Sequence, residues 1–80
     1  MSTREKISCI MKTVKPTKNL ENNTNIVEGG FIDSFELMSL IAVLSDEFGI
    51  EFSIDDIIPE NFNSLDAIAA MVDTLLKKGN

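Results

Sequence analysis

The sequence has 80 residues, 44% of them hydrophobic and 25% charged, which is the composition of one folded domain rather than of a disordered segment. Thirteen acidic residues outnumber seven basic ones, and a net charge of -6 argues against nucleic-acid binding because it repels phosphate backbones and favours partners with basic surfaces. The absence of histidine and the single cysteine, Cys9, exclude the common zinc ligand sets and an internal disulfide.

The first predicted element is a helix over residues 3–14. Its apolar residues recur with the spacing of one helix face, and Ser2 with Glu5 can form a capping box at its start. Pro16 disfavours helical geometry in the residue before it, so the helix should end near there. Cys9 is predicted to be a small buried residue of this helix. The apolar face consists of Ile7, Ile10, Met11 and Val14.

A long loop is predicted from Pro16 to Asp33. Its first part, residues 17–25, is rich in Asn and Thr, which compete for backbone hydrogen bonds and disfavour a helix. Gly29 and Gly30 should make the approach to the next helix flexible and unobstructed. Four apolar residues are expected to hold the loop on the core, namely Ile26, Val27, Phe31 and Ile32.

The second predicted helix begins at Asp33 and ends near Phe48. Asp33 can cap the free N–H groups, Glu36 follows three residues later, and Gly49 can adopt the left-handed conformation that closes a helix. The spacing of apolar residues predicts a core face made of Leu37, Leu40, Ile41, Leu44 and Phe48. Candidates for an exposed apolar contact are Phe35, Met38, Val43 and Ile57.

Between this helix and the last one, the chain is predicted to contain only a short helical element. Residues 50–53 alternate apolar and polar side chains, but they have no partner strand and are therefore expected to form a connection. One helical turn over residues 55–58 is expected before Pro59.

The last predicted helix follows Ser64, which can cap it. Lys77 and Lys78 suit the negative end of its dipole, and Gly79 suits its end. Its apolar face consists of Leu65, Ile68, Val72, Leu75 and Leu76. Together the elements predict an all-α fold, a small four-helix bundle with three longer helices, one short helix and a long first loop, in a single domain over residues 1–80.

Asp33 and Ser34 place a hydroxyl in the first turn of the second helix, beside unpaired backbone N–H groups and the positive end of the helix dipole. A phosphodiester would be favoured there by charge. Ser and Asp are also common at helix starts because they cap, so the pair alone does not establish a site. The whole run over residues 29–38, Gly-Gly-Phe-Ile-Asp-Ser-Phe-Glu-Leu-Met, resembles the attachment motif of acyl and peptidyl carrier proteins, in which Asp-Ser precedes a large apolar residue.

The resemblance extends from the first predicted helix to the last and includes Asp46-Glu47-Phe48 at the end of the second. It implies that Ser34 carries a covalent 4′-phosphopantetheine arm, donated by coenzyme A through a phosphopantetheinyl transferase, with Asp33 as its acidic neighbour. The thiol of the arm would then hold an acyl or aminoacyl group as a thioester for loading and transferring enzymes with basic surfaces. The partner-binding residues implied are Phe35, Glu36, Met38, Asp46 and Glu47, and Ile57 is added as a further apolar contact.

Two residues depart from the pattern of fatty-acid-synthesis carriers. Ser39 stands where those carriers usually have an acidic residue, and Ser45 interrupts the acidic cluster near the helix end. A weaker likeness is to carriers of single amino acids in nonribosomal synthesis or cell-wall D-alanylation. The sequence is therefore compatible with any of four pathways, namely fatty-acid, polyketide, nonribosomal-peptide and D-alanine transfer pathways. The alternative hypothesis is a helical protein-interaction module without a prosthetic group, in which Ser34 is only part of a cap.

The sequence gives no support for catalysis by the chain itself. It has no histidine, no glycine-rich phosphate loop, and no Lys or Arg from Leu20 to Leu76 that could stabilise an oxyanion. Asp55 and Asp56 lack the ordered ligands and central glycine of an EF-hand, so no metal site is expected. No apolar run approaches the ~18 residues that a membrane-spanning helix needs. We expect a monomeric carrier in a reducing cytoplasm.

Overall fold

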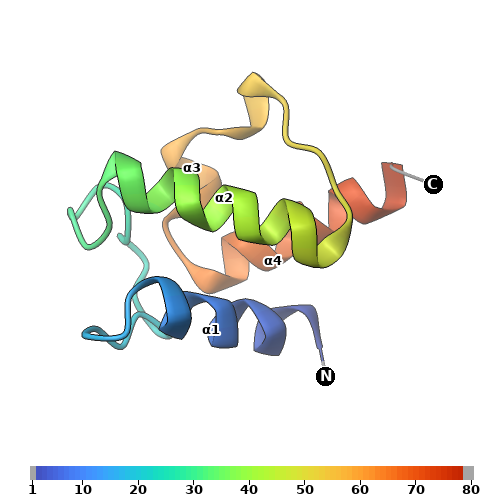
Figure 1. Ribbon diagram of the computed structural model, residues 1–80. Helices are drawn as coiled ribbons and strands as arrows, with labels where there is room; N and C mark the ends of the chain where they lie inside the picture. Colours follow the sequence, from blue (N-terminus) through green and yellow to red (C-terminus); the bar gives the residue numbers. More distant parts are fainter. Residues whose placement is uncertain (1, 79–80) are drawn as a thin grey trace.

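The computed structural model describes residues 2–78 and is all-α over that range (Figure 1). The longer helices are α1 (Thr3–Val14), α2 (Ser34–Phe48) and α4 (Leu65–Lys78), and the short helices between the last two are the 3-10 turn η1 (Ile54–Asp56) and α3 (Pro59–Phe62). Residues 2–78 contain no β-strand, and no helix in that range is both long and apolar enough to cross a membrane. The predicted all-α bundle with three longer helices is confirmed.

The helices pack around α1, which contacts both α2 and α4, while α3 packs against α4. In Figure 1, α1 and α2 run in opposite directions and are joined at one end of the bundle by the long loop. The last turn of α4 lies at the opposite end. The start of α2, where the candidate serine lies, is therefore presented at the loop end of the bundle.

Local capping explains where the longer helices begin. The Oγ of Ser2 accepts the N–H of Glu5 at 3.2 Å, and the Glu5 carboxylate accepts the N–H of Ser2 at 3.0 Å, which completes the predicted capping box. The same reciprocal arrangement joins Asp33 and Glu36 at the start of α2. At the start of α4, the Oγ of Ser64 accepts an N–H of the first turn at 3.0 Å. All three predicted caps are confirmed.

The chain between α2 and α4 differs from the prediction in the position of its short helix. Gly49 closes α2 with φ 64°, as expected, and residues 50–53 form an irregular connection. The turn predicted over residues 55–58 is η1, which starts one residue earlier, and the short α-helix begins at Pro59 instead of ending before it. Proline suits the first helical position because its φ is already helical and its missing N–H would be unpaired there. Gly79, the predicted end of α4, lies outside the described residues.

The core takes residues from the long helices, from α3 and from the loop. In the loop, Ile26 and Ile32 are buried and Val27 is half-buried, as predicted. The prediction for Phe31 is wrong, because this side chain is exposed and its ring lies against Gly29 on the surface of the loop. The largest fully buried side chains are Phe62, Ile7, Ile26, Leu40, Leu44, Leu65, Ile68 and Val72.

Cys9 is exposed, so the prediction that it is buried is also wrong. Ile7 and Met11 of α1 face the core and are 0% and 2% exposed. A residue two positions from either of them is rotated by about 200° around the helix axis, which turns Cys9 to the opposite side.

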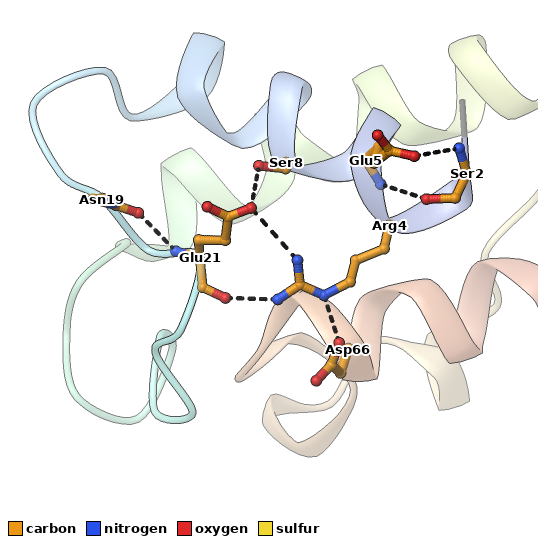
Figure 2. Close-up of polar contacts among 7 residues, drawn as sticks. All are labelled: Ser2, Arg4, Glu5, Ser8, Asn19, Glu21 and Asp66. Atoms are coloured by element: carbon orange, nitrogen blue, oxygen red, sulfur yellow. Dashed lines mark hydrogen bonds and ion pairs between the residues drawn. The ribbon is translucent and has the colours of Figure 1, made fainter.

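Arg4 links α1 to the loop and to α4, as Figure 2 shows. Its Nε lies 2.6 Å from Oδ1 of Asp66 at the start of α4, and its Nη2 donates to the carbonyl oxygen of Glu21 at 2.9 Å. The Glu21 carboxylate lies 3.5 Å from Nη1 of Arg4 and also accepts the Ser8 hydroxyl at 3.4 Å. The hydrogen bond to Asp66 is the largest cause that raises the pKa of Arg4. Because Glu21 follows the buried Leu20, these contacts fasten the first half of the loop to the bundle.

Candidate functional site

Ser34 is the first residue of α2, and its side chain is exposed. Asp33 precedes it as the N-cap, with extended backbone, and Oδ1 of Asp33 accepts the N–H of Glu36 at 2.7 Å. The Ser34 hydroxyl itself makes no hydrogen bond with any residue between 2 and 78. The capping box thus closes the start of the helix without the serine, whose hydroxyl stays accessible for reaction.

The segment before Ser34 folds into consecutive turns over residues 25–32, which we call the Gly-Gly hook. Gly30 has φ 76°, a conformation that other residues rarely adopt. A Cβ on Gly29 would lie 2.5 Å from the carbonyl oxygen of Asn25, to which the Gly29 N–H donates at 2.7 Å. The two glycines thus permit a tight, hydrogen-bonded approach to the start of α2.

Glu36 is held by two partners within the protein. Its Oε1 accepts the N–H of Asp33 at 3.0 Å, and the Nζ of Lys15 lies 2.9 Å from Oε2 and 3.1 Å from Oε1. The hydrogen bond from Lys15 is the largest cause that holds the pKa of Glu36 below its ordinary value of 4.5, and the N–H of Asp33 is the next. Since Lys15 is the C-cap of α1, this ion pair joins the end of α1 to the start of α2.

Replacing Glu36 by glutamine should reduce the stability of the fold at neutral pH but not at acid pH. Glutamine can still accept the N–H of Asp33, so the change removes the charge that pairs with Lys15. The folded-state pKa lies below 4.5, so the carboxylate stabilises the fold above that pH, and its contribution is lost as the pH falls from 4.5 through the folded-state pKa. Urea unfolding should give a lower free energy of unfolding for the variant than for the parent at about pH 6.5, and this difference should shrink as the pH falls below 4.5.

The control for this comparison is Glu60→Gln. The Glu60 side chain is exposed and has no hydrogen bond or ion pair within residues 2–78. The free energy of unfolding of this variant should therefore equal that of the parent both at about pH 6.5 and at about pH 3. If the free energy of unfolding of Glu36→Gln differed from that of the parent by the same amount at about pH 3 as at about pH 6.5, the ion pair with Lys15 would not contribute to stability.

Three of the predicted partner residues of α2 lie on the side of the helix that faces away from the core. Phe35 is 81% exposed and Met38 is 57% exposed, and Asp46 lies within about 20° of Phe35 around the helix axis. Ala42 is exposed between them, and we call these four residues the outward face of α2. Val43 is also exposed, but it lies beside this face rather than on it.

The two glutamates predicted on the same surface lie instead on the side of α2 next to α1. Glu36 pairs with Lys15 at the end of α1. Glu47 lines a groove of about 240 Å³ between the two helices, together with Lys6. The five predicted partner residues of α2 therefore lie on two sides of the helix.

The remaining predicted contact, Ile57, is half-buried and packs against the core. It also lines an open groove of about 400 Å³ that lies between α2 and the chain that follows it. Ile54 lies in η1, between the groove residues Phe52 and Ile57 in the sequence, and is 88% exposed. It was not among the predicted contact residues. Ile54 continues the apolar–polar alternation of residues 50–53 in a segment that has no partner strand, and this is the signal that could have found it. The groove is lined by Met38, Ile41, Ala42, Ser45, Glu51, Phe52 and Ile57.

A family model described as the phosphopantetheine attachment site matches residues 5–72, from the first turn of α1 into the second half of α4. The chain belongs to this family of phosphopantetheine-binding carriers. The family carries 4′-phosphopantetheine as a covalent group, as the resemblance predicted. A comparison of this carrier with curated proteins found no match.

The start of α2 in this carrier fits such a group. The backbone N–H groups of Ser34 and Phe35 have no hydrogen-bond partner within residues 2–78, so they are available to phosphate oxygens. The positive end of the α2 dipole favours the negative charge of a phosphodiester at the same place. Ser34 would hold the group through its Oγ, and Asp33 would keep the turn closed beneath it.

Proposed function

We propose that this carrier holds its 4′-phosphopantetheine arm on Ser34 and presents an acyl or aminoacyl group to partner enzymes. The observation that supports this is the exposed Ser34 hydroxyl at the start of α2, which has no hydrogen-bond partner in the described part of the chain and lies within the matched residues 5–72. Incubation with coenzyme A and a broad-specificity phosphopantetheinyl transferase should add one phosphopantetheine mass, located on Ser34 by peptide fragmentation. A protein that several transferases leave unmodified would support the alternative, an interaction module without a prosthetic group.

In this proposal the chain supplies the nucleophile and the transferase supplies the rest of the chemistry. The Oγ of Ser34 forms a bond to phosphorus while the bond from that phosphorus to the adenosine bisphosphate part of coenzyme A breaks. The hydroxyl proton must pass to a base on the transferase, because the sequence has no histidine and no side chain within residues 2–78 accepts a hydrogen bond from Ser34. The attached arm ends in a thiol, which carries the cargo as a thioester. The chain itself then catalyses no step.

Partner enzymes with basic surfaces are proposed to dock on the outward face of α2 and across the adjoining groove. The exposed apolar side chains offer contact area, and the acidic residues attract a basic partner before contact. Glu36 adds little to that attraction, because Lys15 neutralises its charge at close range. The proposed contact residues are Phe35, Met38, Asp46, Ile54 and Ile57, and Glu47 could add charge only from the flank of α2 next to α1.

Replacing Asp46 by lysine should slow transfer of the arm through the encounter rate. Asp46 is exposed on the outward face of α2 and has no hydrogen bond or ion pair within residues 2–78, so its charge is available to a partner. At low salt the second-order rate of modification should fall by up to about tenfold. The loss should shrink with added salt, since the screening length falls from ~10 Å at 0.1 M to ~3 Å at 1 M.

The matched control is Asp73→Lys, which changes the net charge by the same amount. Asp73 lies on α4 and accepts the hydroxyl of Thr3 at the start of α1, so it is off the outward face. Stopped-flow or quenched-flow modification should therefore leave this variant close to the parent. Equal rates for Asp46→Lys and the parent at low salt would remove the outward face from the docking proposal.

We propose the chemical class of the cargo, an acyl or aminoacyl thioester, and not one particular pathway. Fatty-acid, polyketide, nonribosomal-peptide and D-alanine transfer pathways all use acyl or aminoacyl thioesters, and Ser39 and Ser45 make the fit to a fatty-acid carrier less complete. Ser45 donates its hydroxyl to the carbonyl of Ile50 and so helps to close α2, which gives this departure a structural reason. The mass of the group found on the purified, modified protein would identify the cargo.

We also propose that residues 1–80 act as one monomeric carrier domain. The matched residues include parts of all three long helices, and those helices share one core, which supports a single folding unit. A reducing cytoplasm is the proposed compartment, because the single cysteine of the sequence, Cys9, cannot form an internal disulfide.

A further inference from the structure

Asn63, between α3 and α4, holds the Gly-Gly hook through its side chain. Its Oδ1 accepts the N–H groups of Val27 and Glu28, both at 3.0 Å, and its Nδ2 donates to Oε1 of Glu28 at 2.6 Å. Its carbonyl oxygen accepts the N–H of Ile26 at 2.9 Å. The side-chain contacts join positions 35 and 36 residues apart in the sequence, and no motif in the sequence indicated them.

The burial of Asn63 makes these hydrogen bonds difficult to replace. The residue is only 9% exposed, and no buried side-chain polar atom among the described residues is left without a partner. Water cannot easily take over the role of a buried amide, so the loss of one partner would leave polar groups unsatisfied. The position of residues 26–28 therefore depends on Asn63.

The hook transmits this position to the start of α2. The carbonyl oxygen of Ile26 accepts the N–H groups of Phe31 at 2.9 Å and of Ile32 at 3.3 Å, which closes the hook. Ile26 and Ile32 are 0% and 3% exposed, so the core fixes the hook on its other side. Only Asp33 separates the end of the hook from Ser34.

We propose that Asn63 is a positioning residue for the modification of Ser34, an inference that rests on the proposed role of that serine. By fixing the hook, Asn63 holds the Ser34 hydroxyl in the place from which it enters the active site of the transferase. A small misplacement of a reacting group lowers the rate of the chemical step rather than the affinity for the second substrate. Loss of the Asn63 contacts should therefore lower kcat for transfer by about tenfold and leave KM for coenzyme A unchanged.

A swap of donor and acceptor tests this role. In Asn63→Asp, one carboxylate oxygen still accepts the two backbone N–H groups, but the other faces the carboxylate of Glu28, and kcat should fall. Adding Glu28→Gln provides an amide that donates to the new carboxylate, so the double variant should recover most of the parent's kcat. Glu28→Gln alone should match the parent, because its amide oxygen still accepts from Nδ2 of Asn63.

A control variant must show that a lower kcat does not result simply from a less stable fold. Met71→Ala removes part of a buried side chain of α4 and, at a temperature where all variants are folded by circular dichroism, should keep the parent's kcat. The proposal is overturned if Asn63→Asp has the parent's kcat, if Glu28→Gln does not restore the double variant, or if Met71→Ala is slowed equally. Failure of the unaltered protein to be modified would instead refute the assignment of Ser34.

Hydrogen exchange of the unaltered protein provides a test that needs no variant. The amides of Val27 and Glu28 should exchange much more slowly than that of Asn22, an exposed loop residue whose amide has no hydrogen-bond partner within residues 2–78. Equal exchange rates at these positions would show that Asn63 does not hold the hook, and the proposal would fail even if Asn63→Asp did not fold.

Discussion

Replacing Ser34 by alanine should abolish the addition of phosphopantetheine while leaving the helical fold intact. The Oγ of Ser34 is the proposed nucleophile, and alanine offers no atom in its place. The capping box joins Asp33 and Glu36 and does not include the Ser34 side chain, so the start of α2 should survive the change. The free energy of unfolding should therefore stay within about 1 kcal/mol of the parent. Mass spectrometry after incubation with coenzyme A and a transferase measures the first effect, and urea unfolding measures the second.

Ser39→Ala is the matched control for this experiment. Ser39 is another exposed serine of α2, five residues further along, so the substitution removes the same hydroxyl from the same helix. This variant should still gain one phosphopantetheine mass. Labelling of Ser34→Ala, or loss of labelling in Ser39→Ala, would contradict the assignment. An unfolded Ser34→Ala protein would mean that the serine is structural, which is what the alternative hypothesis requires.

Replacing Phe62 by alanine should remove a large part of the stability of the domain. Phe62 is 0% exposed, lies in the four-residue helix α3, and its ring centroid is 6.1 Å from that of Phe52. Truncation of a buried phenylalanine costs about 3–5 kcal/mol, because apolar contacts are lost and a cavity is left. The total stability of small domains is only about 5–15 kcal/mol, so this single change should bring the protein close to unfolding near room temperature.

Phe35→Ala provides the opposite case with the same chemical change. Phe35 is 81% exposed, so its loss should alter the free energy of unfolding by no more than about 0.5 kcal/mol. It should, however, weaken docking of the transferase, because the side chain belongs to the outward face of α2. Chemical denaturation and modification kinetics on both variants separate the two roles. Similar losses of stability for Phe62→Ala and Phe35→Ala would contradict the burial of one ring and the exposure of the other.

Local structure followed from the sequence because its causes are close together in the chain. The bounds of α1 and α2 depend on Ser2 with Glu5, on Asp33 with Glu36 and on Gly49, and these caps act within a few residues. The family resemblance likewise began with a short run around Ser34, and the order of the predicted helices extended it along the chain. The short helix was misplaced because an isolated helical turn has little intrinsic preference, and Pro59 is compatible with a helix on either side.

The sequence did not predict in the same way which neighbouring helix each helix face contacts. Glu36 and Glu47 were predicted to lie with Phe35 on a partner surface. In the structure, Glu36 pairs with Lys15, 21 residues earlier in the sequence, and Glu47 lines a groove beside α1. Periodicity identifies the core face of a helix but not the charges that a neighbouring helix brings to its flank.

The all-α architecture, the capped start of α2 and an accessible serine at that start could therefore all be predicted from local sequence patterns. The support of that serine, in contrast, depends on contacts between distant segments. The hook before Ser34 is held by Asn63 and by the core residues Ile26 and Ile32, and its two glycines permit its tight turns. Capping and periodicity are local effects, whereas a buried amide finds its partners only after distant segments have packed together.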